Sequence, residues 1–105
     1  MDIKALQARL HNFAEARAWT IFHTPKNLSM ALVVEAAELA EIFQWMTPEE
    51  SISITHNPPA FRAVREELAD VLIYSIRLAA ILNIDLEKAI EDKMEINAKK
   101  YPAEH

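Results

Sequence analysis

The chain of 105 residues contains no glycine and no cysteine. Without cysteine it has no disulfide framework, no zinc–thiolate site and no thiol nucleophile. Without glycine it has neither a P-loop nor a glycine-rich dinucleotide turn, because both need a backbone that phosphates can approach closely. Tight hairpin turns also depend on glycine, so an all-β fold is improbable on this composition.

The chain also lacks an excess of positive charge, since its formal net charge is −5 at pH 7. Proteins that bind nucleic-acid backbones or anionic membranes carry basic patches, so we expect neither partner. No apolar run reaches the roughly 18 residues of a membrane span. The N-terminal residues do not form the apolar core of a signal peptide. We therefore expect a cytoplasmic protein.

What the chain does contain is a globular composition, with 51% hydrophobic and 26% charged residues. A chain of this length forms one domain, so we take residues 1–105 as a single domain. Helical spacing of apolar residues predicts four main helices, over about 3–18, 28–46, 59–82 and 86–101. Their expected caps are Asp2, Asn27 or Ser29, and Asp85, with Asn83 in the left-handed position after the third helix. Residues 47–50 predict one short helical turn, and the polar stretch up to Pro59 is expected to be the longest irregular and most mobile segment.

The predicted fold class is all-α, with four main helices in a bundle. The helix ending near Met46 is apolar almost all round, which is typical of a central or interface helix. This helix and the next carry more apolar residues than one small chain can bury. We therefore expect a homodimer or homotetramer whose core continues across subunits.

Two pairs of acidic residues lie on these apolar helices. Glu35 and Glu38 are three residues apart, as are Glu67 and Asp70, so each pair shares a helical face with core residues. A single pair of this kind is usually a solvated surface feature, but unpaired carboxylates on two buried faces are costly. A bound cation would neutralise them, and four oxygen donors without Cys or His fit Mg²⁺ or Mn²⁺ better than zinc.

Four blocks in order resemble the MazG-type nucleotide pyrophosphohydrolases, most closely their small dCTPase-like branch. They are residues 22–28, the acidic block 35–45 (EAAELAEIFQW), residues 66–74 (EELADVLIY) and residues 93–102. The resemblance implies an all-α, Mg²⁺-dependent enzyme that splits a nucleoside triphosphate into monophosphate and pyrophosphate. It implies metal ligands at Glu35, Glu38, Glu67 and Asp70, and pockets completed by neighbouring chains.

Residue types suggest further roles that the sequence leaves open. A carboxylate near the metal would take a proton from water, and both Glu38 and Glu41 are candidates, although Glu41 lies off the apolar stripe. Lys93, Asn97 and Lys100 share a helical face that is either a solvated basic surface or a phosphate contact, and the resemblance favours the contact. The candidate wall of a base pocket consists of Trp19, His23, Asn27, Trp45 and Tyr74, while His11 is expected to be an ordinary surface residue.

The resulting hypothesis is hydrolysis of dCTP or a modified dCTP, in cleansing or balancing of the nucleotide pool. Two alternatives remain open from the residues alone. One is a catalytically silent nucleotide- or metal-binding module, which would share every motif. The other is a helical interaction protein, such as an antitoxin-like or scaffold dimer, which would leave the four carboxylates without partners.

Overall fold

The computed structural model describes residues 1–103, and they contain helices and turns but no strand. Five α-helices are present, together with the short 3-10 helices Thr20–Phe22 and Ser53–His56. The α-helices are α1 (Ile3–Ala16), α2 (Pro25–Phe43), α3 (Pro48–Ile52), α4 (Pro58–Ile81) and α5 (Leu86–Lys100). The predicted all-α class and its four main helices are confirmed.

Short polar side chains start each α-helix by accepting a backbone hydrogen bond. Asp2 and Asp85 cap α1 and α5, as predicted. The predicted cap of α2 was wrong: Thr24 takes this place, with its Oγ1 accepting from the backbone N–H of Asn27 at 3.2 Å. The helix starts early because Pro25 has the fixed φ that suits a first helical position.

The segment after α2 is more regular than predicted. Thr47 and Glu50 form a reciprocal capping box that starts the predicted short helix, α3. A 3-10 helix follows and contains the buried Ile54. Asn57 then caps α4, which begins at Pro58. The prediction of a long irregular stretch was therefore wrong, because local capping and one apolar anchor organise it.

Two helices end in a left-handed residue without using glycine. Asn83 has φ 55° after α4, as predicted, and Ala18 has φ 57° after α1. In each case the next residue donates its backbone N–H back to the helix: Ile84 to Ala79 O at 2.8 Å and Trp19 to Ala14 O at 2.9 Å. These closures turn the chain sharply at the two ends.

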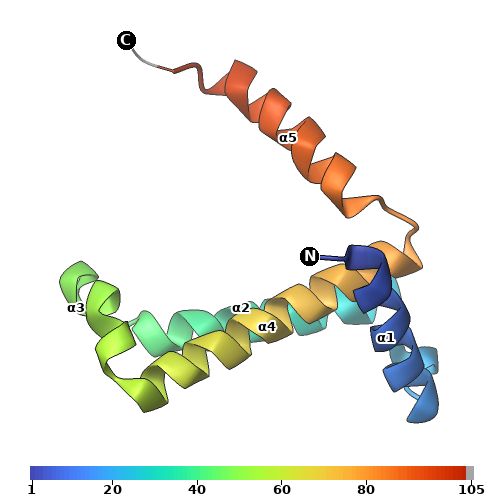
Figure 1. Ribbon diagram of the computed structural model, residues 1–105, viewed down its shortest axis with the longest axis horizontal. Helices are drawn as coiled ribbons and strands as arrows, with labels where there is room; N and C mark the ends of the chain where they lie inside the picture. Colours follow the sequence, from blue (N-terminus) through green and yellow to red (C-terminus); the bar gives the residue numbers. More distant parts are fainter. Residues whose placement is uncertain (104–105) are drawn as a thin grey trace.

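The centre of the molecule is the antiparallel pair of α2 and α4, which lie side by side along most of their length (Figure 1). Helix α1 crosses the C-terminal half of α4. Where the three helices meet, the buried apolar residues are Leu28, Ile76, Ala79 and Ala14. This small core fixes α2 and α4 in the register that positions their acidic residues.

Helix α5 extends away from the other helices instead of packing along them (Figure 1). The radius of gyration is 16.7 Å, whereas a compact chain of this length has about 13 Å. The accessible surface is 8337 Å², against about 6,000 Å² for a compact monomer of this mass. One chain therefore forms an open helical arrangement and leaves large apolar side chains exposed, including Met30, Val33, Val34, Ile90 and Met94.

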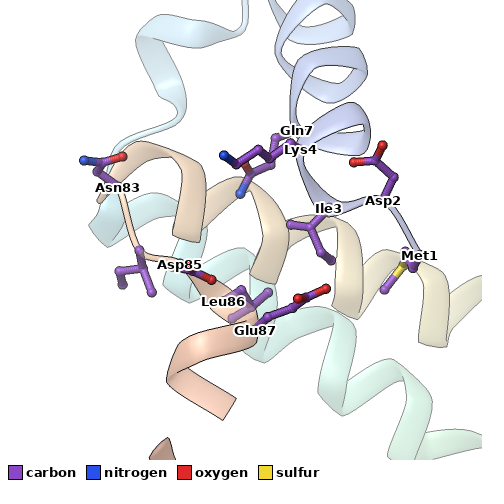
Figure 2. A pocket seen from close by; sticks show the side chains of 10 residues that line it. Met1, Asp2, Ile3, Lys4, Gln7, Asn83, Asp85, Leu86 and Glu87 are labelled. Atoms are coloured by element: carbon purple, nitrogen blue, oxygen red, sulfur yellow. The ribbon is translucent and has the colours of Figure 1, made fainter. Parts of the chain in front are cut away.

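A cavity of about 450 Å³ separates the start of α1 from the connection between α4 and α5. Figure 2 shows that Gln7 and Lys4 reach toward it from α1, opposite Leu86 and Glu87 of α5. None of its lining residues belongs to the two acidic pairs. Among the described residues, no helix combines the length and the hydropathy that a membrane span requires.

Candidate active site

Three of the predicted metal ligands meet between α2 and α4. One carboxylate oxygen from each of Glu35, Glu38 and Glu67 lies within 4.8 Å of the others. Glu35 and Glu38 come from successive turns of α2, and Glu67 comes from the facing side of α4. The three-residue spacing therefore brings the side chains together as predicted. We call Glu35, Glu38 and Glu67 the acidic cluster.

The acidic cluster is electrostatically unsatisfied. The Oε2 atoms of Glu35 and Glu67 are buried, and neither has a hydrogen-bond partner among residues 1–103. The pKa of Glu67 is raised to about 7, chiefly by the adjacent carboxyl of Glu35, with which it can share a proton, and further by burial and by Glu38. The proton shared with Glu67 lowers the pKa of Glu35, but burial, Glu38 and Asp70 outweigh it, so this pKa is raised as well. Such a set of oxygens fits a hard divalent cation.

Asp70 lies one turn after Glu67 on α4 and connects the acidic cluster to a second feature. Its negative charge contributes to the raised pKa of Glu35, so it lies near the cluster. Its side chain also lines a cavity of about 330 Å³. We call this cavity the aromatic cavity. Of the four predicted metal ligands, three therefore form the acidic cluster, and the fourth, Asp70, lies between this cluster and the aromatic cavity.

The aromatic cavity brings together Trp19, His23 and Tyr74, three of the residues predicted to surround a base. Trp19 comes from the turn after α1, His23 follows the first 3-10 helix, and Tyr74 lies one turn after Asp70 on α4. Phe13, which the sequence reasoning missed, packs edge-to-face on Trp19 with ring centroids 5.7 Å apart. Burial, followed by the charges of Glu35 and Asp70, raises the pKa of Tyr74, so its hydroxyl stays protonated.

Two polar residues near the aromatic cavity were also missed. Arg77 lies on α4 and lines the cavity, with its Nε donating to His23 Nδ1 at 3.1 Å and its terminal NH1 lying 3.0 Å from His11 Nδ1. The prediction that His11 is an ordinary surface residue was incomplete: it is exposed, yet it contacts this buried arginine. A signal existed for Arg77, because it is three residues after Tyr74 and seven after Asp70, on the same helical face.

A profile of the MazG-like family matches residues 30–105. The chain belongs to the MazG-like family. It is 48% identical to human dCTP pyrophosphatase 1 over 102 residues, and 46% identical to the rat protein over 101 residues. These alignments cover 97% and 96% of this chain but 58% of each relative, so the chain spans somewhat more than half their length. The structure also resembles that of a pyrophosphatase from Archaeoglobus fulgidus, with a TM-score of 0.88, 38% identity and coverage of 98% of this chain and 94% of that one.

The predicted resemblance to MazG-type proteins is thereby confirmed. Several of the predicted site residues of this MazG-like chain, however, lie outside the acidic cluster and the aromatic cavity. Trp45 follows the end of α2, is 89% exposed in one chain and does not line the aromatic cavity. Asn27 does not line the aromatic cavity; its Nδ2 donates to the carbonyl of Phe22 at 3.0 Å and braces the turn before α2. Within one chain, neither residue is part of the cavity wall.

The predicted phosphate contacts all lie on α5, and they are Lys93, Asn97 and Lys100. All three are exposed, and α5 extends away from α2 and α4, the helices that carry the acidic cluster (Figure 1). Glu41 is closer to the site: it is exposed and shares a shallow depression with Glu38 and Glu67. A single MazG-like chain thus supplies the carboxylates and the aromatic cavity, but not the basic face of α5.

Proposed function

We propose that this chain hydrolyses a deoxynucleoside triphosphate to the monophosphate and pyrophosphate in the presence of a divalent cation. The observation that carries the proposal is the position of Asp70 between the acidic cluster and the aromatic cavity. In such a site the acidic cluster would take the phosphates of a nucleotide and the aromatic cavity would take its base, on adjacent turns of α4. The names of the relatives, dCTP pyrophosphatase and pyrophosphatase, support the same reaction class.

The donor set of the acidic cluster fits Mg²⁺, with Mn²⁺ as an alternative. Carboxylates with two buried, unpartnered oxygens would supply hard ligands from Glu35, Glu38 and Glu67, with Asp70 next to them. A bound Mg²⁺ would neutralise charge on the phosphates and activate a water. The chain itself would hold the phosphate end of the substrate between α2 and α4.

Two carboxylates are candidates for accepting the proton of the attacking water. Glu38 belongs to the acidic cluster, whereas Glu41 lies one turn away, exposed in the depression that also contains Glu38 and Glu67. Glu41 lies outside the group of carboxylates that could hold the metal, so its oxygens would stay available to accept a proton, and we propose it as the general base. Replacement of Glu41 with Gln would then reduce kcat while leaving metal binding intact.

The aromatic cavity is proposed to take the nucleobase. Its volume of about 330 Å³ lies at the lower end of the range for small-molecule pockets. Trp19 and Tyr74 would provide flat apolar walls, and His23 would provide a polar contact. We propose dCTP or a modified dCTP as the first substrate to test, in a role of nucleotide-pool cleansing.

The proposed enzyme is a homodimer or homotetramer. The exposed apolar residues of α2 and α5, together with an accessible surface well above that of a compact monomer, support burial against another copy. In such an assembly α5 of one subunit would bring Lys93, Asn97 and Lys100 to the phosphates held by its neighbour. Trp45 would then also contact the substrate from a neighbouring chain.

The decisive test is a panel of ribo- and deoxynucleoside triphosphates, including modified cytosines, scored for pyrophosphate release. We expect release with Mg²⁺ and none with EDTA, with the highest kcat/KM for a deoxycytidine triphosphate. Binding without pyrophosphate release would indicate a silent nucleotide-binding module. No binding at all, with or without Mg²⁺, would indicate a helical interaction protein.

A further inference from the structure

Arg77 stands out because it is the single buried polar or charged residue among residues 1–103, with 4% of its surface exposed. Neither of the ion pairs found within these residues involves it. A buried guanidinium without a carboxylate costs free energy that an apolar residue at the same helical position would avoid. The burial of this arginine therefore has to be understood from the groups that it contacts.

The two partners of Arg77 are imidazoles, and they accept its protons through the same ring atom. A guanidinium has donors only, so the Nδ1 atoms of His11 and His23 must both be unprotonated acceptors. In the neutral ring the proton then lies on Nε2. The Nε2 of His11 lies 3.4 Å from Oε2 of Glu15, so a carboxylate lies near the ring nitrogen that would carry the proton.

The state of His23 matters because this ring lines the aromatic cavity. With Nδ1 engaged by Arg77, its Nε2–H is left for another acceptor. Burial, and then the positive charge of Arg77, lower the pKa of His23, so the ring stays neutral and its Nδ1 remains an acceptor. The same guanidinium joins α4 to α1 through His11 and to the turn before α2 through His23.

We propose that Arg77 is a positioning residue that holds His23 by its Nδ1 and so presents its Nε2–H as a fixed donor to an acceptor atom of the nucleobase, such as a pyrimidine carbonyl. The inference rests on the proposed function, because it takes the aromatic cavity as the base site. Arg77 itself would not need to touch the substrate. His11 would anchor the second arm of the guanidinium and keep it from rotating.

The first test needs neither substrate nor metal. Long-range proton–nitrogen NMR spectra of the wild-type protein report which imidazole nitrogen carries the proton. We expect protonated Nε2 and hydrogen-bonded, unprotonated Nδ1 for both His11 and His23, and a changed Nδ1 shift of His23 in Arg77→Met. A protonated Nδ1 on His23 in the wild type, or an unchanged His23 spectrum in the variant, would overturn the proposal. A protonated Nδ1 in the wild-type spectrum would overturn the proposal even where Arg77→Met does not fold.

The second test is kinetic and separates positioning from charge. Loss of one oriented hydrogen bond predicts about a tenfold higher KM for Arg77→Met, with kcat changed less than about threefold. In a His23→Ala background the same substitution should leave KM unaltered, because Arg77 acts through that ring. Additive effects, or full recovery of KM in Arg77→Lys, would refute positioning. A wild-type protein without turnover would instead contradict the proposed function, and the NMR result would still test whether Arg77 holds His23 by its Nδ1.

Discussion

Glu35 on α2 and Glu67 on α4 each keep one carboxylate oxygen buried and without a hydrogen-bond partner among residues 1–103. The two groups belong to one cluster: Glu35 raises the pKa of Glu67, whereas Glu67 lowers the pKa of Glu35 but is outweighed there by burial, Glu38 and Asp70, which raise it. Two like charges in this position oppose the packing of the helices that carry them. The site is therefore a place where folding, protonation and metal binding are linked.

The stability of the metal-free protein should depend on pH through Glu67. Its pKa is about 7 in the fold against 4.5 in the reference state. Because the raised pKa favours the protonated form, the fold gains from this group below the lower value and loses that gain as the pH rises through the higher one. We expect the midpoint of thermal unfolding in EDTA to fall between about pH 5 and about pH 8.

Mg²⁺ should counteract this fall of the unfolding midpoint with rising pH, because carboxylates must be deprotonated to bind the metal. The stabilisation by Mg²⁺, measured as the shift in unfolding midpoint relative to EDTA, should therefore grow over the same pH range. A stabilisation that is equally large at both ends of the range would contradict a carboxylate metal site.

Replacement of Glu67 with Gln should separate stability from activity. The amide cannot carry a charge, so above about pH 7, where Glu67 would be ionised, the repulsion with Glu35 disappears and the metal-free protein should unfold at a higher temperature. Loss of a direct ligand should cost at least about 100-fold in kcat/KM, since even outer-shell changes reach that size. Calorimetry in EDTA and a pyrophosphate-release assay with Mg²⁺ measure the two effects.

Glu66→Gln is the matched control, because this neighbouring glutamate is exposed and lies outside the cluster. It should leave both the EDTA midpoint and the activity close to wild type. A loss of activity in Glu66→Gln as large as that in Glu67→Gln would remove Glu67 from the metal site.

Local patterns in the sequence predicted the parts of this structure that depend on neighbouring residues. The spacing of Glu35 and Glu38 sufficed to place both on one face, because helix geometry is periodic. The end of this helix was predicted near Met46, but α2 ends at Phe43, because periodicity does not tell where a helix stops. The direction of α5 was beyond reach because helical spacing does not tell how the chain leaves the turn after α4, and α5 does not pack along the other helices.

The left-handed residue after α1 offers a stabilising substitution. Ala18 has φ 57°, a conformation in which its Cβ crowds the backbone. Ala18→Gly should raise the free energy of unfolding by up to about 1 kcal/mol, with part of the gain lost to the greater freedom of the unfolded chain. Asn83→Gly should gain less, because asparagine tolerates φ 55° better than alanine does. Urea unfolding of both variants gives the comparison, and an equal or larger gain for Asn83→Gly would contradict it.

The exposed apolar face of α2 should be the most sensitive place to disturb the assembly. Val33 is 68% exposed in one chain, within a surface that also includes Met30 and Val34. A charge introduced by Val33→Glu would be desolvated in a subunit interface but fully hydrated in a monomer, so it should weaken association without unfolding α2. Light scattering coupled to size exclusion should show a smaller mass for Val33→Glu than for wild type.

The control for this prediction is Arg65→Glu, which changes the charge at an exposed position on α4. Ala36→Glu would be a poorer control because position 36 is next to Glu35. A wild-type mass of about 12.0 kDa would refute the proposed oligomer outright.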